Sequence, residues 1–405
     1  MSKEYALSDV SFVIPSRNNL KYLKWAYQSI RENIGPDIWI CMADDWSDLD
    51  QTWEWMQEIV EADPRAKAIK NDTGNRLGHT IMYDKIVEEL VETDIFIIAH
   101  ADMYWLPGSV DNMLKHYKGD KTVVSATRIE PPLHPDGPEK HLFDMGQEPE
   151  EFKKEEVLAL NEELKASEAD KVTEGIFAPW MCSKNEFLSI GGHDPLYAPQ
   201  SKEDSDIFNR FVLDDVAVLQ SRDSFVAHLT CRGSRFNPFN TDIGTASDEW
   251  MAQNVRSTRN FIRKWGHFVQ HDALMKPIIP HKYDIGFKVK NAKTNILNSI
   301  EPWCSNIQVS LQNEFIRQYI DFEQPNTAYD LNERIVDWNE ELTNDIIIYI
   351  DGYQFNERTF SILQQLPTII ESNKETIVVG QRFALDTLEI EVRNIRHLEK
   401  DLIKL

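Results

Sequence analysis

The stretch VSFVIPSRNNLKYLKWAYQSIRENIGPDIWICMADD, residues 10–45, decides the fold. It opens with a short apolar run closed by a proline, which is typical of a buried strand. A helix with its apolar residues on one face follows at residues 20–30, and Gly35-Pro36 ends it. A second apolar run at residues 38–42 leads directly into two aspartates. The order strand, helix, strand predicts the first repeat of a parallel sheet.

The same alternation continues through the first third of the chain. Further strands are expected at residues 66–69, 94–99 and 121–127, and helices at residues 50–61 and 80–91. Alternation at this pitch implies right-handed crossovers between parallel strands. It also implies a sheet that is covered by helices on both faces. We therefore predict an α/β protein with a mainly parallel central sheet.

Two changes in the pattern predict the domain organisation. Residues 148–171 are crowded with Glu and Lys, which favours an exposed helix or a mobile insertion. After about residue 275 the pattern restarts, with strands expected at 345–351 and 376–379 and a helix between them at 357–371. We expect one large domain over residues 1–275, containing the acidic insertion. A small C-terminal α/β domain over residues 290–405 would follow, and its sequence indicates no chemistry.

The charge balance limits the classes of partner. The chain has 67 acidic and 43 basic residues and a net charge of −24. Its field repels phosphates, so we expect no general affinity for nucleic acid or anionic membranes. A bound phosphate must then be reached through a metal ion or through local donors. The hydrophobic content of 41% predicts a packed core rather than disorder.

The cysteines and the apolar segments indicate the compartment. Cys41, Cys182, Cys231 and Cys304 are widely spaced and match no metal-binding pattern, so we expect reduced thiols. The first residues lack the layout of a signal peptide. No apolar run approaches the roughly 20 residues that span a bilayer. These features predict a cytoplasmic protein without a transmembrane segment.

Acidic residues follow two of the expected strands. Asp44 and Asp45 end the second strand, where they could accept hydrogen bonds from a nucleobase or a ribose, or simply form a turn that caps the next helix. His100 and Asp102 follow the strand at 94–99 and point to the same side of an extended segment. Such a pair suits Mn²⁺ or Mg²⁺ with phosphates as further ligands, or it forms an ordinary surface pair.

A third acidic cluster opens a helix. Glu203, Asp204 and Asp206 precede the apolar run at 207–213, where the helix dipole stabilises carboxylates. Simple helix capping would explain them equally well. Gly191-Gly192 just upstream permits a tight turn and the close approach of a ligand. A carboxylate beside such a turn could act as general base towards an acceptor hydroxyl.

These motifs, taken in order, resemble the family 2 glycosyltransferases of the GT-A fold. The matching segments are residues 13–18, 43–48, 75–78, 99–102, 191–194 and 203–206, then Arg210, His228 and residues 260–266. The resemblance covers about residues 8 to 270, which is two-thirds of the chain. It implies a Rossmann-like nucleotide-binding domain.

The resemblance also implies site residues. The nucleotide-sugar site would contain Pro15, Arg17, Asp44, Asp45, Arg76 and Ala101. Asp102 would be the last acid of the metal-binding Asp-x-Asp motif, and His228 a further ligand of Mn²⁺ or Mg²⁺. His100 replaces the first acid of that motif, so we expect a metal held mainly through Asp102. Asp204 would be the catalytic base, with Glu203 beside it.

The implied activity is the inverting transfer of a sugar from a nucleotide-sugar donor, most often UDP-linked, to a hydroxyl of a glycan or other acceptor. Trp180 is a candidate platform for a sugar ring or an ordinary buried tryptophan. One alternative is a nucleotide-sugar or carbohydrate-binding module of the same fold that has lost turnover, with His100 marking the loss. A nucleotidyltransferase is disfavoured, because no glycine-rich phosphate loop lies near the first strand.

Overall fold

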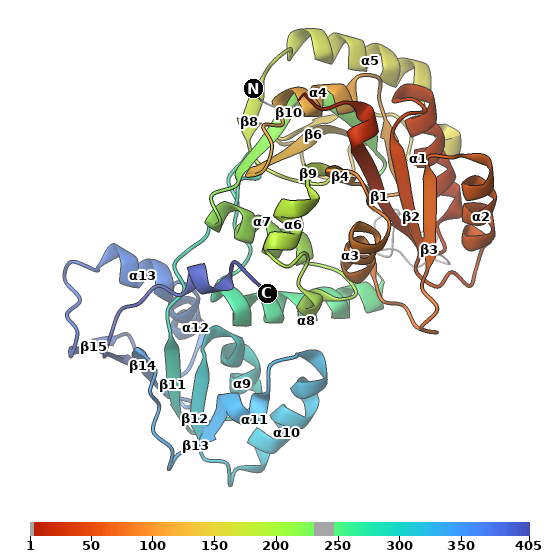
Figure 1. Cartoon of the computed structure of the whole chain (residues 1–405). Helices are drawn as coiled ribbons and strands as arrows, with labels where there is room; N and C mark the ends of the chain where they lie inside the picture. The colour runs from red at the N-terminus through yellow and green to blue at the C-terminus, as the bar shows by residue number, and fades with distance from the viewer. Residues whose placement is uncertain (1–3, 231–246) are drawn as a thin grey trace. The chain divides into compact units, whose positions relative to one another are not determined.

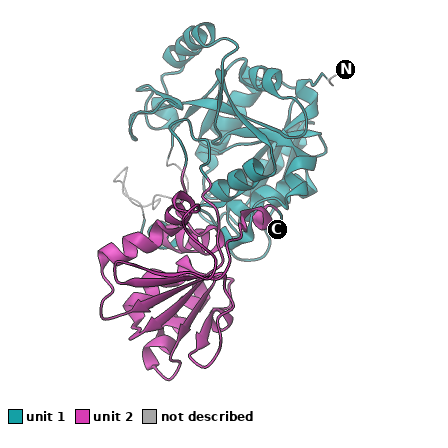
Figure 2. Cartoon of the chain, turned by 90° about the vertical axis from the view of Figure 1, so that its left-hand side faces the viewer, with its two compact units in different colours: residues 1–253, 271–278, 404–405 teal, residues 254–270, 279–403 magenta. Residues whose placement is uncertain are grey.

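The computed structural model describes residues 4–230 and 247–405. The chain divides into two compact units (Figure 2). Unit 1 comprises Met1–Gln253, His271–Ile278 and Lys404–Leu405, and unit 2 comprises Asn254–Gln270 and Ile279–Ile403. Among the described residues, no helix has the length and apolarity that a membrane span requires.

Unit 1 is built on one large mixed sheet (Figure 1). Its strands are β1 (Val10–Ser16), β2 (Trp39–Asp44), β3 (Ala66–Lys70), β4 (Ile95–Ile98), β5 (Met103–Trp105), β6 (Thr122–Glu130), β7 (Lys140–Leu142), β8 (Val172–Glu174), β9 (Trp180–Ser183) and β10 (Ala217–His228). The order is β3-β2-β1-β4-β9-β6-β10-β5, with β7 beside β6 and β8 beside β10.

The four N-terminal strands of the sheet are parallel, as the alternation predicts. β6 and β10 are also parallel, and β9 lies antiparallel between β4 and β6. The apolar runs of β1 and β4 are buried along nearly their whole length, which is the pattern of strands covered on both faces. The prediction of a mainly parallel α/β sheet is therefore confirmed.

Helices connect and cover these strands. They are α1 (Leu20–Asn33), α2 (Thr52–Ala62), α3 (His79–Glu89), α4 (Ser109–His116), α5 (Lys154–Ser167), α6 (Lys184–Ser189) and α7 (Glu203–Leu213). A further helix, α8 (Asp248–Trp265), begins in unit 1 and ends in unit 2. α3 contacts β1, and α4 and α5 contact β10.

The acidic segment forms a packed helix rather than a mobile insertion. α5 buries Val157, and Leu160 and Leu164 pack against the same apolar cluster as Trp25 and Phe225. These leucines and Val157 recur at helical spacing, and their apolar face is enough to attach the helix to the sheet. The many charges of residues 148–171 obscure this face in the sequence.

Unit 2 contains a second, smaller sheet. Its strands are β11 (Ile285–Lys290), β12 (Asn306–Val309), β13 (Ile335–Asp337), β14 (Ile346–Asp351), β15 (Arg382–Leu385) and β16 (Leu388–Val392), in the order β13-β12-β11-β14-β16-β15. Its helices are α9 (Thr294–Ile300), α10 (Glu314–Glu323), α11 (Leu331–Arg334), α12 (Glu357–Gln364) and α13 (Leu366–Ser372). The first four strands of the order are parallel, and β16 runs antiparallel to β14.

The predicted strand at residues 376–379 is wrong. Val378 and Val379 are 64% and 57% exposed and belong to no strand. The predicted helix at 357–371 is two helices, α12 and α13, with Pro367 in the first turn of the second. Proline has no N–H to continue the ladder of α12, but it is accepted at the start of a new helix.

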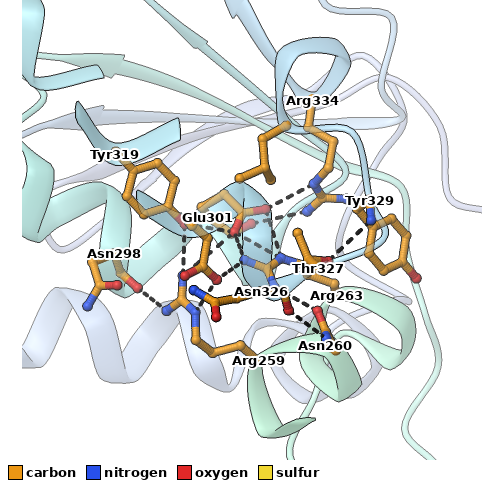
Figure 3. Close-up of polar contacts among 12 residues, drawn as sticks. Arg259, Asn260, Arg263, Asn298, Glu301, Tyr319, Asn326, Thr327, Tyr329 and Arg334 are labelled. Atoms are coloured by element: carbon orange, nitrogen blue, oxygen red, sulfur yellow. Dashed lines mark hydrogen bonds and ion pairs between the residues drawn. The ribbon is translucent and has the colours of Figure 1, made fainter. Parts of the chain in front are cut away.

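A network of buried charges lies inside unit 2 (Figure 3). Both carboxylate oxygens of Glu301 are bonded: Oε2 accepts from Arg263 Nη2 at 2.6 Å and Tyr319 Oη at 2.9 Å, and Oε1 accepts from Arg334 Nε at 2.9 Å. Burial alone would raise the pKa of Glu301, but Arg263 and Arg334 lower it to about 2. Glu323 pairs with Arg259 and Arg263, so two carboxylates balance three guanidinium groups.

We expect Glu301→Gln to destabilise unit 2 by about 3–5 kcal/mol, because two guanidinium groups lose the same buried anion. Urea unfolding followed by circular dichroism measures this change. Glu375→Gln, at an exposed position of the same unit, is the matched control and should unfold like the unmodified protein. Equal free energies of unfolding for both variants would show that the network adds nothing to stability.

Candidate functional site

Asp45 fixes a loop at the carboxyl end of β2. Its Oδ1 accepts hydrogen bonds from Asn71 Nδ2 at 2.7 Å and from the Leu77 backbone N–H at 2.9 Å. Its Oδ2 accepts from the Gly78 backbone N–H at 2.7 Å. Since a carboxylate offers about four lone-pair positions, three of them are used inside the protein. Asp45 therefore shapes the 71–78 loop and retains capacity for one more donor.

The 71–78 loop packs closely against the segment that precedes α7. Gly78 has φ +87°, and a Cβ added there would lie 2.0 Å from the carbonyl oxygen of Pro199. Only glycine permits this approach. Arg76 in the same loop donates to Gln200 Oε1 at 2.8 Å. The loop that Asp45 holds is thus in contact with the approach to α7, where the predicted catalytic acids lie.

The remaining nucleotide-site candidates lie around the ends of β1 and β2. Pro15 pairs with Ala43 across the two strands. The Asp44 carboxylate is fully buried and accepts from the Ser47 backbone N–H at 3.2 Å, and burial raises the pKa of Asp44. Arg17 is partly exposed, and its guanidinium lies 3.6 Å from Asp48. Asp44 is enclosed by protein, whereas Arg17 remains accessible.

Three predicted metal ligands come together near the carboxyl ends of β4 and β10. The ligand atoms of His100, Asp102 and His228 all lie within 4.8 Å of one another. His228 Nε2 is 3.5 Å from Asp102 Oδ1, and the His100 and His228 ring centroids are 5.6 Å apart. The sheet brings them together because His228 pairs with Met103, next to Asp102, across β10 and β5.

Glu130 contacts the ring nitrogen of His228 that faces away from Asp102. Its Oε1 is 2.9 Å from Nδ1 of His228, which leaves Nε2 directed to Asp102. Burial alone would lower the pKa of His228, but Asp102 and Glu130 raise it to about 9. Burial lowers the pKa of His100 to about 4, and the charge of Asp102 only partly offsets this effect. No pattern in the sequence marks Glu130, which ends a long buried strand.

The cluster fits a divalent cation of intermediate softness. Two imidazole nitrogens and one carboxylate oxygen suit Mn²⁺ better than Mg²⁺, which prefers oxygen alone. A carboxylate on the far ring nitrogen is the usual support of a metal-binding histidine, and Glu130 supplies it. This support belongs to His228, whereas His100 joins the cluster only through the position of its ring next to Asp102 and His228.

Asp204 and Glu203 begin α7 and have different surroundings. Glu203 is buried, and its Oε1 lies 2.7 Å from His79 Nε2. Asp204 is half-buried, and no described residue donates a hydrogen bond to its carboxylate. Burial and the charge of Glu203 raise the pKa of Asp204 to about 6. A carboxylate with this pKa is ionised at neutral pH and still basic enough to take a proton.

Two histidines lie beside these acids. The predicted site residues include neither, although His193 belongs to the matching segment 191–194. His79 is the first residue of α3 and bonds Glu203. His193 is buried, and its Nδ1 lies 2.6 Å from Asp84 Oδ1. Burial alone would lower the pKa of His193, but Asp84, with smaller contributions from Asp204 and Glu203, raises it. The raised pKa of His193 places positive charge near the two acids, which limits the mutual repulsion of the carboxylates.

The structure places Trp180 in the core. Its side chain is fully buried, with the rings of Phe96, Phe208 and Phe211 around it. A ring enclosed in this way presents no face to a sugar, so the ordinary buried tryptophan is the reading that the structure supports. Ala101 is also buried, and it lies between the metal-ligand candidates His100 and Asp102 in the sequence.

Three cysteines are buried and make no disulfide: Cys41, Cys182 and Cys304. Cys231 lies outside the described residues.

The comparison with known families agrees with the site. Residues 11–176 match the family described as Glycosyl transferase family 2. This range is similar to that family, and it contains most of β1, all of β2 to β8 and the candidate residues from Pro15 to Asp102. The acids of α7 and His228 lie beyond the matched range.

Several solved structures are similar to part of this chain. GalNAc-T7 with UDP, GalNAc and Mn²⁺ is 13% identical with a TM-score of 0.45, over 63% of this chain and 47% of that one. The mannosyltransferase PcManGT from Pyrobaculum calidifontis, in complex with GDP-Man and Mn²⁺, is 14% identical with a TM-score of 0.42, over 63% of each chain. S. aureus TarS 1–349 is 12% identical with a TM-score of 0.39, over 63% of this chain and 80% of that one.

The matched regions span less than two-thirds of the length of the first two structures. No curated protein matches the sequence.

Proposed function

We propose that the protein is an inverting, metal-dependent glycosyltransferase that moves a sugar from a nucleotide-sugar donor to a hydroxyl acceptor. The observation that carries this proposal is a half-buried carboxylate without a described hydrogen-bond donor, Asp204, in the same unit as a three-residue cluster suited to Mn²⁺. The match to family 2 supports it. Either feature alone would suit a binding protein. The two together would supply a base for the acceptor hydroxyl and a cation for the departing diphosphate.

The donor would bind at the carboxyl ends of β1, β2 and β4, where parallel sheets bind nucleotides. Arg17 and Arg76 supply positive charge there. Burial lowers the pKa of Arg76, and the nearby charge of Arg17 lowers it further. Asp45 holds the loop that carries Arg76 and has one acceptor position left for a base or ribose group. We infer a UDP-linked donor from the resemblance of these motifs to the family pattern.

A divalent cation held by His100, Asp102 and His228 would neutralise the charge of the departing diphosphate. Asp204 takes the proton of the acceptor hydroxyl. The acceptor oxygen then forms a bond to the anomeric carbon while the bond from that carbon to the diphosphate oxygen breaks. Attack from the face opposite the leaving group inverts the configuration. The buried Glu203 carboxylate keeps a second negative charge next to Asp204 and so raises the basicity of Asp204.

A panel of nucleotide sugars with Mn²⁺ tests the activity. We expect one donor to release free nucleoside diphosphate, faster when glycan acceptors are added. A protein that binds a donor but releases no diphosphate with any acceptor would be a binding module of the same fold.

We expect the rate of transfer to rise with pH through about 6, because the base must be deprotonated and the pKa of Asp204 is raised to about 6. The dependence of kcat/KM on pH measures this midpoint. In Glu203→Gln the repulsion by the neighbouring carboxylate is lost, so the midpoint should move to lower pH. Glu174→Gln, at an exposed position, should leave it in place. The same midpoint in all three proteins would contradict the role of Glu203.

A further inference from the structure

Unit 1 contains an open cleft of about 630 Å³ that the proposed reaction does not use. Its walls are the segment from Asp136 to Phe143, the residues Leu160 and Leu164 of α5, and Arg222 of β10. It shares no residue with the candidate metal ligands or with the acids of α7.

Arg222 is the unusual member of this cleft. The residue is 8% exposed, and its Nη1 is buried without a hydrogen-bond partner among the described residues. Other buried arginines of the described chain are paired: Arg210 with Asp206 and Arg128 with Glu130. Burial lowers the pKa of Arg222, and the charges of Glu168 and Glu139 only partly offset it. A buried guanidinium without an anion is costly, and it calls for a partner.

An irregularity of the strand puts Arg222 in this position. The register between β10 and β6 shifts between Ser221 and Phe225, so Arg222 lies in a bulge and opposes no residue of β6. Its backbone N–H bonds Lys171 O at 2.9 Å instead. Bulges turn side chains out of the regular ladder, and here the side chain lines the cleft.

The rest of the cleft combines one more polar atom with an apolar wall. His141 Nε2 is buried and has no partner among the described residues. Burial and the charge of Arg222 lower the pKa of His141, so the ring is neutral at pH 7 and can donate from Nε2. The apolar wall consists of Leu142, Phe143, Leu160 and Leu164. The Lys140 ammonium also lines the cleft, but Glu130 binds it at 3.2 Å.

We propose that this cleft is a second ligand site. Its ligand carries an oxyanion, either a phosphate or a carboxylate, that is joined to an apolar group. The guanidinium of Arg222 pairs with the anion, and His141 donates a further hydrogen bond to it. The apolar group packs against the leucines of α5. This ligand is separate from the nucleotide-sugar donor, since the residues that bind the two are different.

Phenyl phosphate is a suitable probe because it joins an oxyanion to an apolar ring. Inorganic phosphate and benzyl alcohol are the controls, since each carries only one of these two groups. We expect isothermal titration in EDTA to show phenyl phosphate binding to the full chain more tightly than either control. Saturating UDP should not displace it, and Asp102→Asn should bind it equally well. Phenylacetate in place of phenyl phosphate tells whether the site prefers a carboxylate.

Arg222→Met should weaken phenyl phosphate binding by about tenfold or more, because an ionic hydrogen bond is lost. The Tm of the free Arg222→Met protein should equal or exceed that of the unmodified chain, since an uncompensated charge has been removed. Arg358→Met, at an exposed position, is the matched control. His141→Phe keeps the ring but removes its donor and should weaken binding as well.

Three outcomes overturn the proposal: no binding of phenyl phosphate at millimolar concentration, displacement by UDP, or equal binding by Arg222→Met. A Tm of Arg222→Met several degrees below the control would show that Arg222 serves the fold and not a ligand.

Discussion

Asp204→Asn lowers the rate of sugar transfer by about 10²–10⁴-fold, which is the usual contribution of a general base. The amide keeps the size of the side chain but cannot take the proton of the acceptor hydroxyl. Donor binding should stay nearly unchanged, because the proposed partner of Asp204 is the acceptor hydroxyl. Transfer is measured with saturating donor and varied acceptor, and donor affinity by isothermal titration in the presence of Mn²⁺.

Asp215→Asn is the matched control, because it makes the same change at an exposed residue just after α7. It should transfer sugar at the unmodified rate. Equal rates for Asp204→Asn and Asp215→Asn would rule out Asp204 as the base. A loss of donor binding in Asp204→Asn would instead place this carboxylate in the donor site.

Asp102→Asn weakens Mn²⁺ binding by about 100-fold or more, because the carboxylate is the only anionic ligand of the three-residue cluster. Transfer should fall with it and recover in part at high Mn²⁺ concentration. Titration of the apoprotein with Mn²⁺, followed by electron paramagnetic resonance of the free ion, measures the affinity directly and needs no substrate.

Asp111→Asn, on the exposed side of α4, is the matched control and should bind Mn²⁺ like the unmodified chain. EDTA should abolish transfer by the unmodified protein, and added Mn²⁺ should restore it. If EDTA leaves both donor binding and turnover unchanged, the cluster of His100, Asp102 and His228 has another purpose.

The sequence predicts the parallel part of the large sheet because β1, β2 and β4 are mostly apolar runs between helices. It does not predict β9, whose residues Trp180–Ser183 are short and enter the sheet antiparallel. β15 and β16 form a hairpin in unit 2, and the sequence contains a pattern that would have predicted its second strand. In Leu388–Val392 alternate residues are apolar, and these are the buried ones. The nearby run at 376–379 is equally apolar, but it lies in a turn after α13.

For the site, the sequence predicts the residues that end strands or begin helices, since the topology of a parallel sheet gathers those positions. Partners that come from distant segments could not be predicted. Glu130 and His228 are 98 positions apart, and His79 and Glu203 are 124 apart. Only the register between strands and the packing of α3 near α7 bring them into contact. For Trp180 the sequence left two alternatives, a platform for a sugar ring or an ordinary buried tryptophan. Only the packing of the folded chain decides between them.

The hydrogen bonds of Asp45 reach only the two ends of the 71–78 loop. Asn71 at one end and Leu77 and Gly78 at the other are held to the sheet, while residues 72–75 between them are exposed. Within the loop the Asn75 carbonyl also accepts from Asn71 Nδ2 at 2.7 Å. This is a backbone contact, so the middle of the loop can change in sequence at constant length. Directed evolution of donor preference has a defined starting point here: a library over residues 72–75, with Asp45 and its three partners left as they are.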